Sequence, residues 1–143
     1  MKLNFELVPD GCWYSNLRSI LPASDWEIIK KVVKRDAKGK CSICGEKPKI
    51  LHAHEVWSYD EEKAVQRLEK VIAVCPDCHS VIHIGYTQLK GDVVRAEEHF
   101  MKVNGCSYAE YRQALGKANE EHKRRNKVSE WSLDLSFLKD FKG

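Results

Sequence analysis

The stretch VCPDCHSVIH, residues 74–83, places two cysteines and two histidines where they suit metal binding. Cys75 and Cys78 form one C-x-x-C pair, and Cys41 and Cys44 form another earlier in the chain. Two such pairs supply the four thiolates of a tetrahedral zinc site, in which no coordination position stays open for a substrate. The sequence therefore predicts a structural Zn²⁺ on these four cysteines, which would contribute folding energy rather than chemistry.

Four histidines lie close to the two cysteine pairs. His79 and His83 are four residues apart in a segment expected to be helical, so both rings share one helix face. His52 and His54 are two residues apart on an expected strand and also share a face. The zinc would tie the turn before this strand to the start of that helix. We therefore expect three or four imidazoles to converge next to the zinc.

The hydrophobic periodicity and the capping signals predict an α+β chain. Strands are predicted at 3–7, 50–57 and 70–74. Helices are predicted at 25–37, 60–68, 76–84, 92–104 and 107–121. Residues 131–137 alternate at period two, which predicts either a strand beside the N-terminal one or an extended segment packed on helices.

Length and composition fit one soluble globular domain. The chain has 143 residues and a formal net charge of +3, from 24 basic and 21 acidic residues. This mild basic excess does not by itself identify a polyanionic partner. The first ten residues lack the long apolar stretch of a signal peptide, and no segment is apolar enough to span a membrane. We therefore expect a cytoplasmic protein with reduced thiols, which favours metal binding over disulfides.

The remaining cysteines and histidines have no metal-binding spacing. Cys12 and Cys106 lack a C-x-x-C partner, and we expect free cysteines at both positions. His99 and His122 each stand alone in the sequence, and we expect them to have structural roles.

Three segments together resemble the HNH, or ββα-metal, nuclease family: CSICG at 41–45, LHAHEVW at 51–57, and the stretch at 74–83. Further segments resemble one bacterial and phage branch of that family, and extend the similarity over nearly the whole chain: 12–19, 57–60, 66–68, 83–85, 103–105 and 130–136.

The resemblance implies an α+β fold in which a ββα-metal core with a Cys₄ zinc is flanked by several α-helices. It places one nuclease domain over residues 1–143, with the core at about 38–90. A strand and helix at 1–37 and a helical extension at 91–143 would pack on that core.

The resemblance also implies an activity, the metal-dependent hydrolysis of phosphodiester bonds in nucleic acid, with DNA as the expected partner. His54 matches the general base of the family, and His79 and His83 match ligands of one divalent catalytic ion. His52 takes the place of a further ligand, but it lies two residues before the base instead of one. Glu55 is a candidate for holding the tautomer of His54, with an exposed or capping carboxylate as the alternative.

One family feature is missing from the sequence. The middle Asn of the motif is absent from the expected neighbourhood, Lys70-Val71-Ile72. The resemblance implies that this Asn braces the hairpin, and here Gln66 or backbone groups would have that role.

The catalytic ion is expected to be Mg²⁺, Mn²⁺, Ni²⁺ or Zn²⁺. Imidazole ligands favour the transition ions, whereas a Mg²⁺ site would call for carboxylate oxygens. The resemblance implies products with a 5′-phosphate and a 3′-hydroxyl.

Nucleic-acid binding is expected to come from phosphate contacts by basic side chains. The candidates are Lys47, Lys49, Arg67, Lys123, Arg124 and Arg125. The alternative for the basic run at 123–127 is a solvated helix end. For the whole protein, the alternatives are a zinc-stapled DNA-binding module or an assembly protein without catalytic activity.

Overall fold

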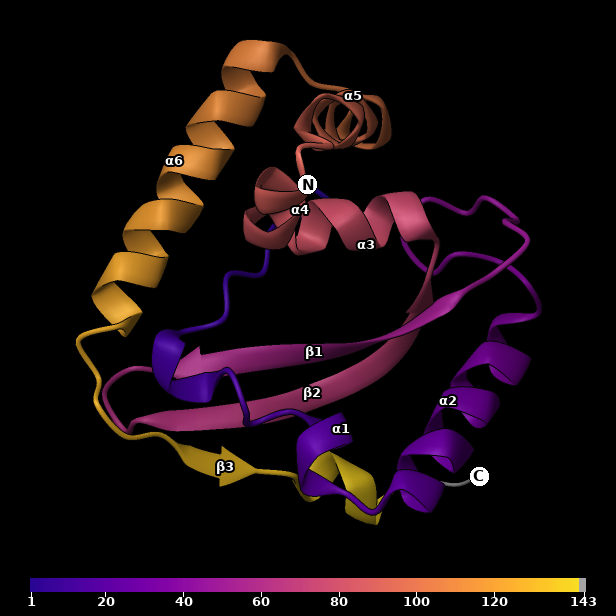
Figure 1. Cartoon of the computed structure of the whole chain (residues 1–143), viewed down its shortest axis with the longest axis vertical. Helices are drawn as coiled ribbons and strands as arrows, with labels where there is room; N and C mark the ends of the chain where they lie inside the picture. Colours follow the sequence, from indigo (N-terminus) through magenta and orange to yellow (C-terminus); the bar gives the residue numbers. More distant parts are fainter. Residues whose placement is uncertain (142–143) are drawn as a thin grey trace.

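The computed structural model describes residues 1–141, which form an α+β structure of six α-helices and a three-stranded mixed sheet (Figure 1). The helices are α1 (Leu17–Ile20), α2 (Ala23–Ala37), α3 (Pro76–Ile82), α4 (Ile84–Lys90), α5 (Val93–Asn104) and α6 (Tyr108–Arg125). The strands are β1 (His52–Asp60), β2 (Val65–Val74) and β3 (Ser132–Asp134). Two 3₁₀ turns, η1 (Asp10–Cys12) and η2 (Ser136–Lys139), complete the elements.

A long antiparallel hairpin forms the centre of the sheet. β1 pairs with β2 in a register that sets His54 opposite Ile72, and the pairing shifts by one residue between Val56 and Trp57. β3 extends the sheet by pairing in parallel with the first residues of β2. The end of β2 leads directly into α3, so the order strand, strand, helix of a ββα unit is present.

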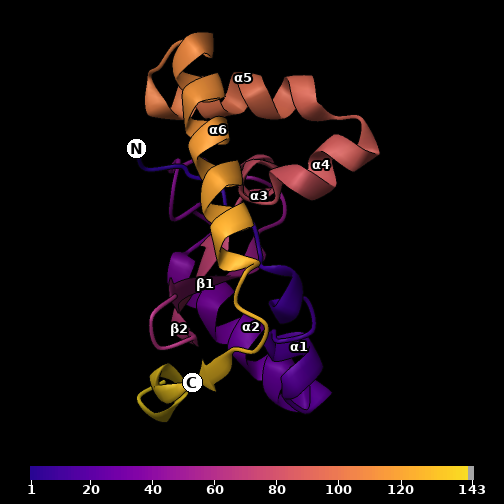
Figure 2. The same cartoon turned by 90° about the vertical axis from the view of Figure 1, so that its left-hand side faces the viewer.

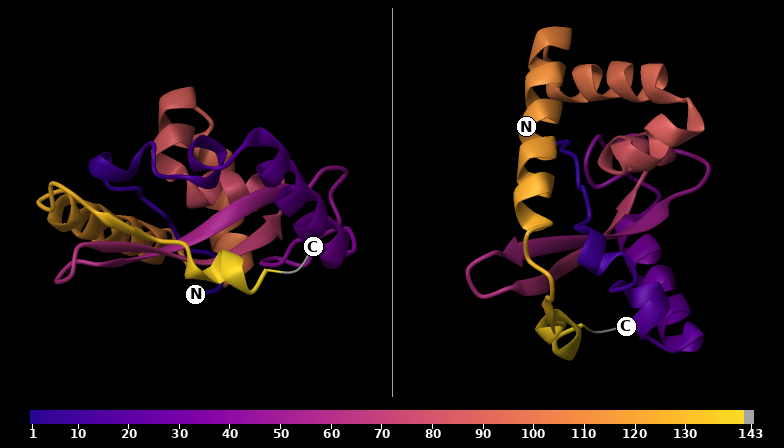
Figure 3. Two further views of the ribbon diagram at one scale, coloured as in Figure 1. Left: turned by 90° about the horizontal axis from the view of Figure 1, so that it is seen from below. Right: turned by 60° about the vertical axis from the view of Figure 1, so that its left-hand side comes forward.

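The helices surround the hairpin on several sides. α2 packs against both hairpin strands, and α3 packs against β1 (Figure 1). α5 lies across α3, and α6 descends from α5 toward the hairpin turn (Figure 2). The N-terminal segment runs between α6 and the hairpin (Figure 3, right). This arrangement buries a core that includes Leu3, Leu17, Phe100 and Tyr111.

Much of the predicted secondary structure is confirmed. The helices predicted at 25–37 and 92–104 match α2 and α5, and the strand predicted at 50–57 lies largely within β1. The capping box of Ser107 and Glu110 starts α6, which continues to Arg125, past the predicted end. α2 begins after Pro22 without a side-chain cap.

The helix predicted at 60–68 is wrong, because this segment forms the hairpin turn and the first residues of β2. Asp60 accepts a hydrogen bond from the Lys63 backbone, and Ala64 adopts a left-handed conformation with φ of 53°. Beyond this turn Gln66 and Leu68 are both buried, which is the period-two pattern of a strand. The strand predicted at 70–74 is thus the second half of β2.

The strand predicted at 3–7 is an extended segment without strand pairing in residues 1–141. The side chain of Asn104 makes the hydrogen bonds that a neighbouring strand would make. It accepts one from the N–H of Leu3 at 3.0 Å and donates one to the C=O of Leu3 at 2.8 Å. Phe5 stacks on Phe100 at a centroid distance of 4.9 Å. The tail strand β3 consequently pairs with β2 and not with the N-terminal segment.

The helix predicted at 76–84 is α3, which ends at Ile82 because His83, with φ and ψ of −97° and 53°, breaks the helix. A further helix that was not predicted, α4, follows directly. This break turns α4 away from the axis of α3 (Figure 2). None of the helices within residues 1–141 is long and apolar enough to cross a membrane.

Candidate metal centres

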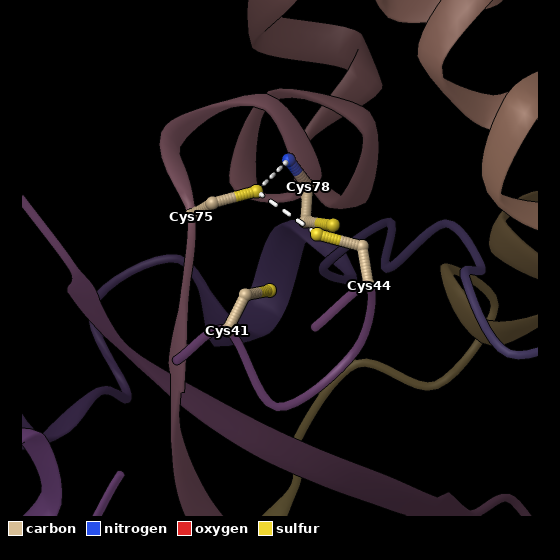
Figure 4. A group of neighbouring side chains, drawn as sticks. All are labelled: Cys41, Cys44, Cys75 and Cys78. Carbon is tan, nitrogen blue, oxygen red and sulfur yellow. Dashed lines mark hydrogen bonds between the residues drawn. The ribbon is translucent and has the colours of Figure 1, made fainter. Parts of the chain in front are cut away.

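The four cysteines predicted to bind zinc meet in one cluster. Their sulfur atoms all lie within 4.8 Å of one another, and the side chains point toward a common centre (Figure 4). The Sγ atoms of Cys44 and Cys75 are 3.7 Å apart. Zn–S bonds of about 2.3 Å in a regular tetrahedron require sulfur atoms about 3.8 Å apart. The cluster is therefore consistent with a structural zinc site.

Local structure positions the two C-x-x-C pairs. Cys75 caps α3, and its sulfur accepts a hydrogen bond from the Cys78 N–H at 3.3 Å. The other pair lies in a tight turn in which Gly45 has φ of 80°, a conformation that favours glycine. The Ser42 N–H bonds the carbonyl of Ala73 on β2 at 2.9 Å, which ties this turn to the hairpin. Cys12 and Cys106 are free, as predicted, and none of the four clustered cysteines forms a disulfide.

The clustered cysteines differ in pKa because their environments differ. Burial raises the pKa of Cys75 to about 11 and raises that of Cys78 further. Burial also acts on Cys41, but hydrogen bonds from neighbouring backbone groups outweigh it and lower its pKa to about 7. Four thiolates packed this closely repel one another, and a bound cation would compensate their charge.

His99 touches the zinc cluster, although sequence reasoning gave it only a structural role. Its Nε2 lies 3.2 Å from the sulfur of Cys78, within hydrogen-bonding distance. Because His99 belongs to α5, this contact joins the C-terminal helices to the cluster.

Three of the four neighbouring histidines form a second candidate metal group. One ring nitrogen from each of His54, His79 and His83 lies within 4.8 Å of the others. The ring centroids of His79 and His83 are 4.8 Å apart, and both rings lie edge-on to that of His54. The convergence of strand and helix imidazoles predicted from the sequence is thus observed.

These rings are suited to binding a cation. Burial, together with the neighbouring imidazoles, lowers the pKa of His79 to about 3. Burial and His54 lower the pKa of His83 to about 4. Both rings are therefore neutral near pH 7 and offer nitrogen lone pairs, which suit Zn²⁺, Ni²⁺ or Mn²⁺ better than Mg²⁺.

His52 lies beside this group but outside it. Its Nδ1 is 2.9 Å from Nδ1 of His79, so it contacts only one of the three rings at hydrogen-bonding distance. This position allows His52 either to support His79 or to approach the same ion.

Glu6 was not anticipated from the sequence, and it holds the buried ring of His54. Its Oε2 lies 2.8 Å from His54 Nε2, which leaves Nδ1 as the free ring nitrogen. Glu55, the candidate from the sequence, does not bond this ring; its carboxylate accepts a hydrogen bond from the Leu17 backbone N–H. No signal near residue 6 could have identified Glu6, because the N-terminal segment reaches His54 only through the tertiary fold.

Gln66 is buried on β2, and its Nε2 donates to the carbonyl of Ser15 at 3.0 Å. It therefore fastens the segment before α1 to the hairpin. Its other side-chain atom, Oε1, is buried without a partner among residues 1–141.

Most of the basic side chains proposed to bind nucleic acid lie away from the histidines. Arg67 is paired with Asp134 at 3.0 Å, and Arg124 is paired with Glu61 at 2.6 Å. Arg125 lines a cavity of about 790 Å³ that also reaches His54. The remaining candidates are exposed and line none of the cavities at the histidines: Lys47, Lys49 and Lys123.

Comparison with known protein families, with curated proteins and with solved structures finds no match to this chain. Within residues 1–141 the geometry defines two possible metal sites, a Cys₄ cluster and a His₃ group, beside a β-hairpin that leads into a helix. This arrangement is compatible with the ββα-metal fold that the sequence resembles.

Proposed function

We propose that this protein is a metal-dependent endonuclease of the HNH type that hydrolyses phosphodiester bonds in DNA. The observation that carries the proposal is the His54 ring, which contacts Glu6 through Nε2 and whose centroid lies 5.5 and 5.3 Å from those of His79 and His83. A general base beside a cation site is the minimum that hydrolysis of a phosphodiester requires.

His54 is proposed as the general base. A neutral imidazole has one N–H donor and one nitrogen that accepts a proton. With Nε2 directed at Glu6, the nitrogen left to accept a proton from water is Nδ1. The Glu6 carboxylate would fix this tautomer and stabilise the protonated ring that forms, as a buried carboxylate does for other catalytic histidines.

His79 and His83 are proposed to hold the divalent ion, and their neutral rings and close spacing fit this role. When bound, the ion would neutralise the charge that develops on the phosphate and on the leaving oxygen. The four cysteines are proposed to hold a separate Zn²⁺ that fixes the start of α3, and with it the direction of His79.

A zinc-stapled nucleic-acid-binding module without catalytic activity is the second candidate. The observation that favours it is the absence of an Asn at Lys70-Val71-Ile72. In the structure Gln66 does not replace that residue near the histidines, because its side chain reaches Ser15 instead.

Cleavage of supercoiled plasmid and of a labelled single-stranded oligonucleotide by the zinc-loaded protein tests the proposal, with Mn²⁺, Ni²⁺, Zn²⁺ or Mg²⁺ added in turn. His54→Ala should slow cleavage by roughly a hundredfold or more, since general bases contribute about 10²–10⁴ in rate. If His54 is the base, this variant should still bind the divalent ion, whereas His83→Ala should lose it.

Tyr108→Ala is the control, because Tyr108 is exposed at the start of α6 and lines none of the cavities at the histidines. Absence of cleavage of both substrates with every ion, or undiminished cleavage by His54→Ala, would rule out this mechanism and favour the binding module.

A further inference from the structure

Two of the cavities at the candidate histidine site share three histidines. One has a volume of about 650 Å³, and the other about 600 Å³. Both are lined by His52, His79 and His83. Each cavity is in the size range of ligand-binding clefts, and the three shared histidines place both cavities at the same candidate site.

The first cavity combines exposed aromatic rings with basic side chains. Trp13 and Tyr14 lie on its wall, and they are 61% and 85% exposed. Arg18 and Lys34 line the same cavity and have no ion-pair partner within residues 1–141. Large aromatic rings left this open to water are typical of binding surfaces.

The second cavity repeats this combination. Tyr86 is 65% exposed on its wall, and the Lys90 ammonium lies 5.4 Å from the centroid of that ring. Aromatic and cationic groups therefore line both cavities at the candidate site.

We propose that the two cavities form one groove for an unpaired DNA strand that crosses the histidine site. Bases would stack on Trp13, Tyr14 and Tyr86, while phosphates would lie near Lys34 and Lys90. This inference rests on the proposed nuclease function, because it takes the histidine group as the place where the scissile phosphate sits.

The choice of an unpaired strand follows from the stacking groups. An exposed aromatic side chain binds the face of a base, and in a duplex those faces are covered by the neighbouring base pairs. Arg18 and Lys34 of the groove differ from Arg124 on α6 and Arg67 on β2, which are already paired with acidic groups. Arg18 and Lys34 thus add positive charge, unpaired within residues 1–141, beside the exposed aromatic rings.

Fluorescence anisotropy of labelled oligo(dT)₂₀ and of a 20-base-pair duplex tests the inference. The zinc-loaded protein is used without any added divalent ion, so that binding is measured apart from cleavage. We expect tighter binding to the single strand. Trp13→Ala, Tyr14→Ala and Tyr86→Ala should each weaken that binding by roughly tenfold, the loss typical of one stacking contact.

Tyr108→Ala is the matched aromatic control, since Tyr108 is 51% exposed at the start of α6 and lines none of these cavities. Lys34→Ala and Lys31→Ala form a matched basic pair on α2, of which only Lys34 lines the groove. Only Lys34→Ala should reduce the salt dependence of binding, by about 0.7 in the slope of log K against log salt concentration.

Tighter binding to the duplex, or aromatic variants that bind oligo(dT)₂₀ like the unaltered protein, would overturn the groove and leave the nuclease proposal standing. Binding that follows the aromatic variants without any cleavage would support the groove and overturn the nuclease. Absence of binding to either DNA would overturn the groove whatever the cleavage assay shows. Circular dichroism of each variant verifies that the exposed substitutions leave the fold intact.

Discussion

The cysteine cluster and the histidine group are neighbours, but their surroundings differ. Cys78 and His79 are consecutive residues, yet Cys78 is fully buried in the core while His79 lines two open cavities. The sulfur cluster is enclosed by a turn, a strand end and a helix start, and the imidazoles face the space where a ligand can enter. One short helix therefore presents a structural site on one side and a candidate reactive site on the other.

The two groups also differ in how well they tolerate burial when no cation is bound. Burial raises the pKa values of Cys75 and Cys78, so thiolates at these positions are unfavourable until a cation compensates them. Burial lowers the pKa values of His79 and His83, so these rings are neutral near pH 7 and can remain buried without an ion. We therefore expect the fold to depend on the first site and not on the second.

The largest expected effect is the loss of the fold when a cysteine ligand is removed. Structural zinc contributes on the order of 10 kcal/mol in small zinc domains, comparable with the whole stability of a typical protein. Cys78→Ser should lose its zinc and its cooperative thermal transition, whereas His83→Ala should keep both. Metal analysis and thermal melting by circular dichroism measure this contrast.

Cys106→Ser is the control for that experiment, because Cys106 lies outside the cluster. Equal melting temperatures for Cys78→Ser and Cys106→Ser would show that the four sulfurs do not hold the fold.

A smaller effect is expected from Glu6→Gln, which keeps the shape of the side chain but removes its charge. The nicking rate should fall by roughly ten- to a hundredfold, the usual cost of losing a carboxylate that orients a histidine at a metal site. The melting temperature and the affinity for Co²⁺, followed by absorbance, should change little if His54 acts as the base.

Glu61→Gln is the matched control, because Glu61 pairs with Arg124 near the hairpin turn. A loss of Co²⁺ affinity in Glu6→Gln as large as the loss of activity would instead make His54 a ligand.

The smallest effect is expected from His99→Ala, which removes one hydrogen bond to the sulfur of Cys78. A net loss of about 1 kcal/mol corresponds to roughly fivefold faster transfer of zinc to a competing chelator. Stopped-flow absorbance with a chromogenic chelator measures this rate. Identical transfer rates in the variant and the unaltered protein would mean that α5 does not stabilise the zinc site.

Both metal groups could be predicted from the sequence because their spacing is local. Two cysteines in one turn, or two histidines four apart on a helix, point the same way wherever the element lies. The two cysteine pairs, like the two histidine pairs, are then brought together by the pairing of β1 with β2. Alternating residues on the two strands specify that pairing.

Other parts of the site could not be predicted, because they depend on tertiary contacts. Glu6 lies in a segment without regular structure, and no spacing connects it with His54. The aromatic wall at Trp13 and Tyr14 likewise reaches the histidines only through the packing of α1 and α2. The wrong prediction of a helix at 60–68 has a local cause. The polar turn residues resemble a helix start, and only the pairing with β1 favours a strand.

The double hydrogen bond between Asn104 and Leu3 has a consequence for the smallest functional piece of the chain. Asn104 is the last residue of α5, and it anchors the backbone three residues before Glu6. The carboxylate that holds the His54 ring is thus positioned by a residue far beyond the hairpin and α3. A fragment cut down to residues 38–90 would retain every sulfur and imidazole of the two clusters. It would lose Glu6 and the Asn104–Leu3 hydrogen bonds that position Glu6 against the ring of His54.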